Sequence, residues 1–205
     1  MVGDWRIHGL PRCSHHVFLS HCAEDRKRLA QPIYDALEAS KYFPWLDRHD
    51  YPRGRDPFAA LREGILGCRH VVPIISHALI SQGRGWTSVE NTYASLLQEN
   101  FQFHSLELCT VQFPLFFLPY EHEILRRSSW APLIHRGRFY PPGTVDQGAV
   151  GWAVKEIIAF IKQEEKRGAA IAEQAENDRP FHALFGDERH ALRRIMCADP
   201  PPGAE

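Results

Sequence analysis

The chain has 205 residues, a length that suits one domain with extensions. Hydrophobic residues make up 44% of it and charged residues 24%, which is ordinary for a globular protein, and the formal net charge is −1. So small a net charge gives no broad field for nucleic acid or an anionic membrane. The five cysteines are dispersed, as is typical of reduced thiols in a cytosol. We therefore expect a soluble, cytoplasmic protein that binds neither nucleic acid nor membrane.

The sequence predicts neither a signal peptide nor a membrane-spanning segment. The first 14 residues lack the apolar region of a signal peptide, since they include Asp4, Arg6, Pro11 and Arg12. The most apolar run, residues 113–119, is too short to span a bilayer and is typical of a buried strand.

Short apolar runs typical of strands alternate with segments that have a helical period. Residues 17–20 form the first predicted strand, and Leu29, Ile33 and Leu37 recur every four residues in a helix predicted over 25–39. Pro32 either lies near the start of that helix or bends it. The remaining predicted elements are strands 42–47, 71–76, 113–118 and 138–140, helices 58–67, 86–98, 120–127 and 147–166, and loops 48–57 and 77–85.

The order of these elements predicts the fold. The strand at 71–76 is nearly all apolar, as in parallel sheets that are covered on both faces. The alternation then indicates a flavodoxin-like α/β fold, a doubly wound parallel sheet of about five strands flanked by helices. In such sheets ligands bind at the carboxyl ends of the strands, where residues 20–25, 47–58 and 77–90 fall.

The stretch Gly85-Trp86-Thr87-Ser88-Val89-Glu90 opens the helix predicted over 86–98. Trp86 and Glu90 are four residues apart, so they share one face of that helix. An aromatic plane beside a carboxylate suits a ring held near a site of developing positive charge. An isolated pair of this kind is nevertheless more often a core anchor beside a solvated acid. The predicted inner face of the helix consists of Val89, Tyr93, Leu96 and Leu97.

Four motifs in chain order resemble those of a TIR domain of the bacterial type. The first strand runs into Ser20-His21 and then Asp25, and the second ends in Trp45-Leu46-Asp47. Residues 48–58, with Pro52-Arg53-Gly54, correspond to the BB loop of the family. The third strand ends in Ser76, and a Trp-x-x-x-Glu motif follows at Trp86 and Glu90.

This resemblance covers about residues 15–165 and implies the TIR fold. It predicts a lead-in at residues 1–14, a TIR domain at 15–167 and a C-terminal extension at 168–205 that is helical or partly disordered. The chain departs from the family at His21, where an aromatic residue is common, in the Arg- and Asp-rich loop, and at residues 101–109, which look inserted.

Many bacterial and plant TIR domains cleave NAD at the nicotinamide–ribose bond, and the catalytic glutamate of the family lies in the position of Glu90. The resemblance therefore implies an enzyme, an NAD+ nucleosidase that takes NAD+ as its substrate and needs no cofactor. Its product is ADP-ribose or a cyclic ADP-ribose isomer. The resemblance also implies TIR self-association and bacterial antiphage immunity, and it leaves room for an effector protein that senses the product.

The other candidate site residues lie at the carboxyl edge of the predicted sheet and would contact NAD+: Ser20, His21, Asp25, Asp47, Arg53, Arg55, Phe58 and Trp86. Trp86 would pack against the nicotinamide side of the substrate. Arg53 and Arg55, together with Arg48, suit bidentate contact with a pyrophosphate. Each position has an alternative. Ser20 and Asp25 could cap a helix, and Asp47 could hold the loop after it. The arginines could be solvated, and Phe58 is more typical of a core.

Other functional classes are consistent with parts of the sequence. The main alternative is a non-enzymatic TIR adaptor or host-directed effector that acts through TIR–TIR contacts alone. A receiver-type phosphoacceptor domain is excluded, since the chain has His21-Cys22 where that class needs an acidic pair and Ser76 where it needs Asp. The chain has 12 histidines but no Cys-x-x-Cys or His-Glu-x-x-His motif, so we expect no metal site.

Overall fold

The computed structural model describes residues 15–47, 54, 56–82, 85–103, 111–128, 130–141 and 148–177. The chain divides into two compact units, Met1–Glu165 and Lys166–Glu205. The first unit holds the sheet. Of the second, the structure describes residues 166–177, which end the helix α7 (Ala149–Asn177). Within these ranges no helix is long and apolar enough to cross a membrane. The domain boundaries expected from the sequence remain predictions.

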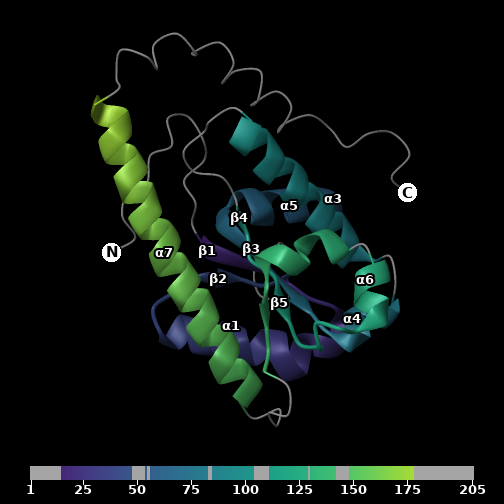
Figure 1. The fold of residues 1–205 in the computed structure, drawn as a ribbon. Coiled ribbons are helices and arrows are strands. Elements are labelled where there is room, and N and C mark those ends of the chain that lie inside the picture. Colours follow the sequence, from purple (N-terminus) through teal and green to yellow (C-terminus); the bar gives the residue numbers. More distant parts are fainter. Residues whose placement is uncertain are drawn as a thin grey trace. The chain divides into compact units, whose positions relative to one another are not determined.

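The described strands are β1 (His15–Ser20), β2 (Pro44–Trp45), β3 (Cys68–Ile75), β4 (Val111–Gln112), β5 (Leu115–Phe116) and β6 (Arg138–Phe139). They form one sheet in which every pair is parallel. The order is β2-β1-β3-β5-β6, and β4 also pairs with β3 (Figure 1). If β4 and β5 count as one interrupted strand, this is the flavodoxin-like order. The predicted fold is confirmed.

The strand predicted over 113–118, or from a little before residue 113, consists of two pieces in the structure, β4 and β5. β4 pairs with the middle of β3, and β5 pairs with its end. Pro73 in β3 and Pro114 between β4 and β5 lie in this gap, and proline has no backbone N–H to donate. The ladder is therefore interrupted here, and the prediction of one continuous strand is wrong.

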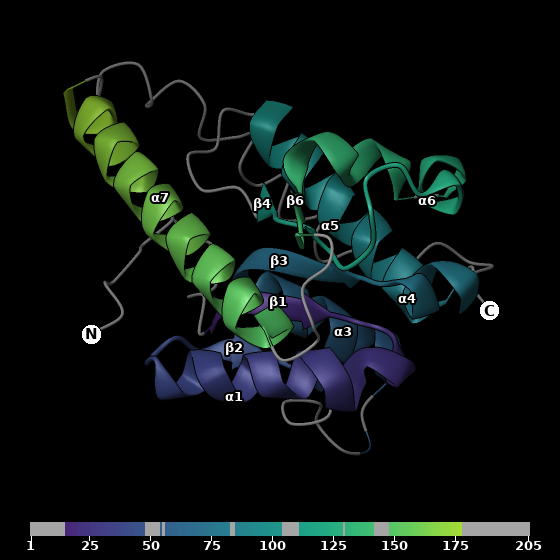
Figure 2. The ribbon, with the colours of Figure 1, turned by 60° about the horizontal axis from the view of Figure 1, so that its bottom comes forward.

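Helices cover the sheet. They are η1 (Ala23–Asp25), the π-helical η2 (Arg26–Ala30), α1 (Gln31–Ala39), α3 (Pro57–Leu66), α4 (His77–Gln82), α5 (Trp86–Phe103), α6 (Glu123–Arg127), η3 (Ala131–Arg136) and α7. On one face α1 and the first turns of α7 enclose the main hydrophobic core with β1 and β3 (Figure 2). α3 and α5 contact each other and β3.

The helix predicted over 25–39 is confirmed, and its apolar stripe of Leu29, Ile33 and Leu37 is buried. Pro32 lies in the first turn of α1, and the π-helical turn η2 runs directly into it, so the helical hydrogen-bond pattern changes where proline has no N–H to donate. The loop predicted over 77–85 is wrong, because α4 occupies most of it. Ser76 Oγ accepts a hydrogen bond from the Leu79 amide at 3.1 Å and so caps the first turn of α4.

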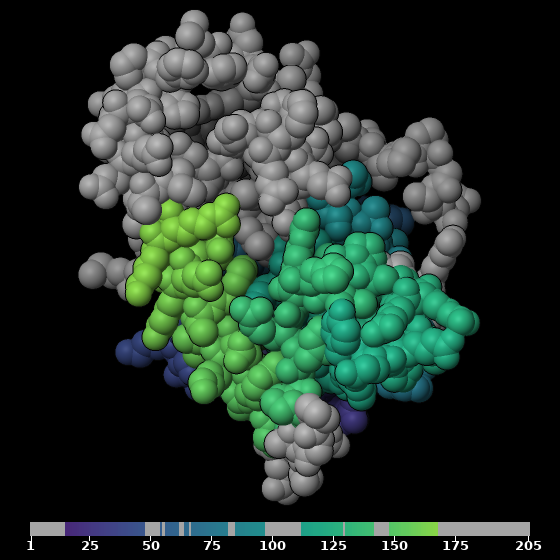
Figure 3. Space-filling model, in the orientation of Figure 1, coloured from purple at the N-terminus to yellow at the C-terminus, as the bar shows by residue number. Residues whose placement is uncertain are grey.

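A second hydrophobic cluster lies under α4, α6 and η3. Ile75 and Phe116, at the ends of β3 and β5, pack there against Leu79, Leu125 and other buried side chains. Figure 3 shows the outer surface of this part of the first unit, formed by the residues that follow β4. The cluster fixes the helices that follow β3 and β5 at the carboxyl edge of the sheet.

The inner face of α5 differs from the prediction. Val89 and Leu96 are 40% and 52% exposed, whereas Thr87 and Ala94 are buried, and the side chain of Leu97 lies outside the described residues. The predicted apolar inner face is therefore wrong at Val89 and Leu96, whereas Tyr93 is half-buried.

The cause is a buried glutamine in β4. The Gln112 side-chain amide donates to the Asn91 carbonyl at 3.1 Å and to Asn91 Oδ1 at 2.8 Å, and its oxygen accepts from Ser95 Oγ at 3.1 Å. These bonds turn the polar side of α5 toward the sheet, because a buried amide must be paired.

His70 is the least satisfied side chain of the core. Its ring is 4% exposed, neither ring nitrogen has a hydrogen-bond partner, and its edge meets Phe160 of α7 at a centroid distance of 4.9 Å. Burial, reinforced by the positive charge of Arg69 and by His16, lowers the pKa of His70 to about 3. The folded chain therefore holds this imidazole neutral.

We expect His70→Leu to make the chain more resistant to acid. The unfolded chain binds a proton at His70 below its ordinary pKa of 6.5, and the folded chain does not until about pH 3. Native stability should therefore fall as the pH drops below 6.5, and the leucine variant should be the more stable by about 2 kcal/mol at pH 5. Urea unfolding at pH 5 and 7.5 measures this. The exposed His135→Gln serves as control, and equal acid sensitivity of native and leucine chains would contradict the assignment.

Candidate active site

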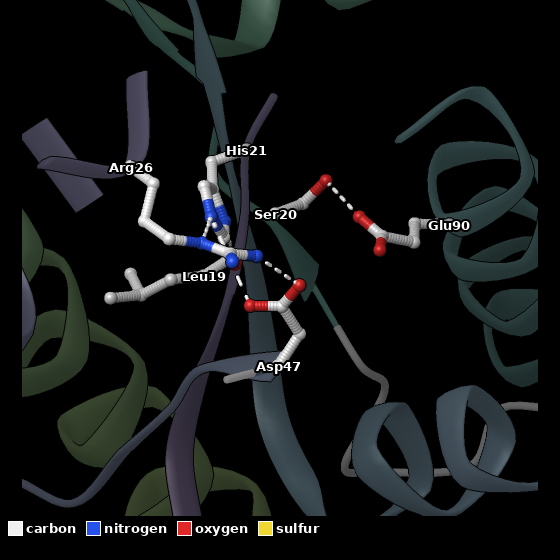
Figure 4. A network of polar contacts seen from close by, with 6 residues as sticks. All are labelled: Leu19, Ser20, His21, Arg26, Asp47 and Glu90. Carbon is white, nitrogen blue, oxygen red and sulfur yellow. Dashed lines mark hydrogen bonds and ion pairs between the residues drawn. The ribbon is translucent and has the colours of Figure 1, made fainter. Parts of the chain in front are cut away.

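Ser20, the last residue of β1, meets Glu90 of α5 at the carboxyl edge of the sheet. Ser20 Oγ donates a hydrogen bond to Glu90 Oε2 at 2.5 Å (Figure 4). The serine is buried, and the glutamate is only partly exposed. The fold thus joins two of the predicted site residues, which come from segments far apart in the sequence.

Glu90 has an unusual pKa for a carboxyl group. Burial and, to a smaller extent, the negative charge of Asp47 raise it to about 7, although the hydrogen bond from Ser20 acts in the opposite sense. A carboxyl group that changes charge near neutral pH, at the ligand-binding edge of an α/β sheet, is typical of functional sites.

Asp47, which follows β2, is held by an arginine. Arg26 donates from Nη2 to Asp47 Oδ2 at 2.5 Å and from Nε to His21 Nε2 at 3.1 Å (Figure 4). Asp47 Oδ1 is buried and makes no hydrogen bond, although it lies 3.9 Å from His21 Nε2. One oxygen of this carboxylate is therefore anchored, and the other still has its accepting capacity.

The His21 side chain is only 3% exposed, and both of its ring nitrogens are engaged. Nδ1 lies 3.3 Å from the Leu19 carbonyl, and Nε2 accepts from Arg26. Burial lowers the pKa of His21, and the Arg26 charge adds to this, while Asp47 and the Leu19 carbonyl oppose it. A neutral ring with its proton on Nδ1 satisfies both contacts. The ring therefore holds the Arg26 guanidinium in position for its contact with Asp47.

Asp25 is 1% exposed and lies inside the site wall. Its carboxylate accepts hydrogen bonds from Cys22 Sγ at 3.0 Å and from Ser76 Oγ, and Arg28 approaches it at 3.4 Å. As the residue that precedes η2, it makes no side-chain capping bond to that helix. Because Ser76 directly follows β3, these contacts tie the carboxyl ends of β1 and β3 together.

Two aromatic rings line the outer part of the site. Phe58 of α3 and Trp86 of α5 have ring centroids 4.8 Å apart at an angle of 54°. Trp86 is 49% exposed and Phe58 is half-buried, so neither is a closed core side chain. A further aromatic ring could be placed against this exposed pair.

The sequence was compared with known protein families. Residues 17–118 match the TIR domain family, and the match contains Ser20, Asp47, Trp86 and Glu90. The chain carries a TIR domain. The search of curated proteins found no match.

Solved structures with a similar chain trace include TIR domains. One is the TIR domain of the Toll-related receptor TRR-2 from Hydra magnipapillata, at 12% identity and a TM-score of 0.43, with 60% of this chain and 94% of that chain covered. Another is the TIR domains of the activated Roq1 resistosome that recognises the pathogen effector XopQ, at 18% identity and a TM-score of 0.45, covering 78% and 99%. With both scores below 0.5, the fold assignment rests on the family match and the strand order.

Some predicted contacts of the TIR domain fall outside the described residues, namely Arg53 and Arg55, with Arg48. Gly54 between them is described and has φ of 81°, a conformation that favours glycine in a turn. Sequence reasoning missed Arg26 and Gln112. Arg26 carries no motif beyond its place one residue after Asp25, and Gln112 lies in a segment whose periodicity predicted nothing.

Proposed function

We propose that this TIR domain is an NAD+ nucleosidase that cleaves the bond between nicotinamide and ribose. The observation that carries the proposal is the Glu90 carboxyl, held by Ser20 at the carboxyl edge of the sheet in the position of the family's catalytic glutamate. Its pKa of about 7 gives it a large ionised fraction at neutral pH. NAD+ is then a substrate, and no cofactor is required.

The reaction suits a single well-placed carboxylate. When the C1′–N bond breaks, its electron pair leaves with nicotinamide and the ribose becomes an oxocarbenium-like cation. Ionised Glu90 beside that carbon stabilises the positive charge. Water that bonds to C1′ and releases a proton gives ADP-ribose, whereas a nucleophile within the same molecule gives a cyclic isomer. Ser20 orients the carboxylate and so acts as a positioning residue.

The surrounding side chains suit the rest of NAD+. Asp47 would accept a hydrogen bond from a ribose hydroxyl while Arg26 holds its Oδ2 in place, and substrate binding would have to uncover Oδ1, which is buried here. Trp86 and Phe58 would flank a ring of the substrate. Arg53 and Arg55 would meet the pyrophosphate. Asp25 would act indirectly, by fixing the ends of β1 and β3.

Within this proposal the chain acts in the cytoplasm in bacterial antiphage signalling. Self-association of TIR domains would complete or activate the site, and an effector protein would sense the product. The alternative is an adaptor or host-directed effector that works through TIR–TIR contacts without chemistry.

The proposal is tested by incubating the concentrated chain with NAD+ and identifying the products by mass spectrometry. We expect free nicotinamide together with either ADP-ribose or a cyclic ADP-ribose, which is lighter by one water. If NAD+ stays intact under conditions in which the chain is folded and self-associated, the adaptor function is the correct one. The mass of the second product decides between hydrolase and cyclase.

Gln112 provides a prediction about positioning. Its hydrogen bonds hold Asn91 and Ser95, which follow Glu90 in α5. Gln112→Met keeps the volume but removes these bonds, so we expect kcat to fall by about tenfold or more with KM nearly unchanged. Steady-state kinetics at pH 8 measures this, with Gln163→Met on the exposed side of α7 as a matched control. An unchanged kcat in a folded variant would show that Gln112 does not position Glu90.

A further inference from the structure

Two histidines meet at the carboxyl edge over the neighbouring strands β3 and β5. His77 begins α4 directly after β3, and His122 is the residue before α6. Their ring centroids are 5.4 Å apart, and the ring planes cross at 76°. In Figure 1, α4 and α6 lie next to each other at this edge.

The contacts of the two rings are compatible with metal binding. His77 Nδ1 lies 3.2 Å from Ser81 Oγ, one turn on in α4, and this contact orients the ring. A histidine that binds a metal usually has its second nitrogen held in this way. His122 Nδ1 is buried and has no hydrogen-bond partner. An unpaired buried nitrogen is costly unless something coordinates it.

We propose that His77 and His122 bind one divalent transition-metal ion of the zinc class. Neutral imidazole is the commonest protein ligand of such ions. In the described part of the chain no group of three or more His, Cys, Asp or Glu side chains could hold a metal. Two imidazoles with water in the remaining positions therefore make an exchangeable site, unlike a structural zinc site with four protein ligands.

Metal bound here would join α4 to α6. α4 is fixed to Asp25 through Ser76, whose Oγ bonds both the aspartate and the Leu79 amide. The two helices otherwise meet through the apolar cluster below them. A bound ion should thus raise the thermal stability of the chain, because it binds the folded arrangement and finds no such pair in the unfolded chain. This inference does not depend on the proposed NAD+ cleavage.

The test uses the untagged, full-length chain after treatment with EDTA. Zn2+ is titrated against a chromophoric chelator, and Tm is measured with Zn2+ and with EDTA. The variants are His77→Gln, His122→Gln and, as a control on exposed η3, His135→Gln. We expect the native chain and His135→Gln to bind one equivalent of Zn2+ that both other variants lose, together with the Zn2+-dependent rise in Tm.

Two results would overturn the proposal. One is that Zn2+ binding and the Tm shift are the same in all four proteins, which would mean that other histidines of the chain bind the ion. The other is that the native chain binds no Zn2+ in competition with the chelator. Because Tm in EDTA is measured for every variant, loss of folding is separated from loss of binding.

Discussion

Glu90→Gln is expected to lower the rate of nicotinamide release from NAD+ by about 10²–10³-fold. Glutamine keeps the size of the side chain and can still accept the hydrogen bond from Ser20, but it has no negative charge to set against the oxocarbenium-like cation. Loss of a single electrostatic contact made in the transition state typically costs a factor of this size. Rates of nicotinamide release at pH 8, where native Glu90 is mostly ionised, measure the effect.

The matched control is Glu38→Gln, an exposed glutamate of α1, which should keep the native rate. Stability provides a second readout. The folded pKa of about 7 lies above the ordinary 4.5, so ionisation of Glu90 destabilises the folded chain as the pH rises between these values. Glu90→Gln should therefore be at least as stable as the native chain at pH 8. A stable variant that retains the native rate would show that the glutamate is not catalytic.

Gly137→Ala is expected to cause the largest loss of stability. Gly137 precedes β6, and a Cβ atom there would lie 2.2 Å from Phe116 Cε2 and 2.9 Å from the Pro114 carbonyl oxygen. Phe116 cannot move aside easily, because it is fully buried and stacks on Phe139 at 4.5 Å. Forcing a methyl group into such a site costs about 3 kcal/mol, which corresponds to a fall in Tm of roughly 10 °C.

Gly151→Ala is the matched control, because a Cβ atom at Gly151 in α7 would have no atom within 4 Å. Alanine is the better helix former, so this variant should gain about 0.5–1 kcal/mol. Thermal unfolding of both variants followed by circular dichroism makes the comparison. Equal Tm values for the two would mean that β6 is not packed against β5 as described here.

The sequence predicted the sheet and most helices because their signals are local. Apolar runs marked β1 and β3, and the stripe of Leu29, Ile33 and Leu37 marked the helix that ends in α1. The Trp-x-x-x-Glu motif located Glu90 at the correct edge. These features depend on residue type and spacing within one element, and so they can be recognised from a single chain.

What the sequence could not predict depends on contacts between distant segments. The orientation of α5 follows from the amide of Gln112, which overrides the apolar stripe that Val89 and Leu96 suggest. α4 forms because Ser76 caps it while donating to Asp25. Arg26 joins the site only because the fold brings Asp47 to it. The periodicity of apolar residues along the sequence does not predict such contacts, because each partner alone looks like an ordinary polar residue.

The measurement that tests the account most directly is the rate of nicotinamide release by the native chain between about pH 5 and pH 9. If ionised Glu90 stabilises the cation, the rate should fall about tenfold per unit below its pKa of about 7 and level off above it. Release of nicotinamide with this profile would support both the reaction and the residue. No nicotinamide at any pH, or a rate that stays flat between pH 5 and pH 7, would contradict the account.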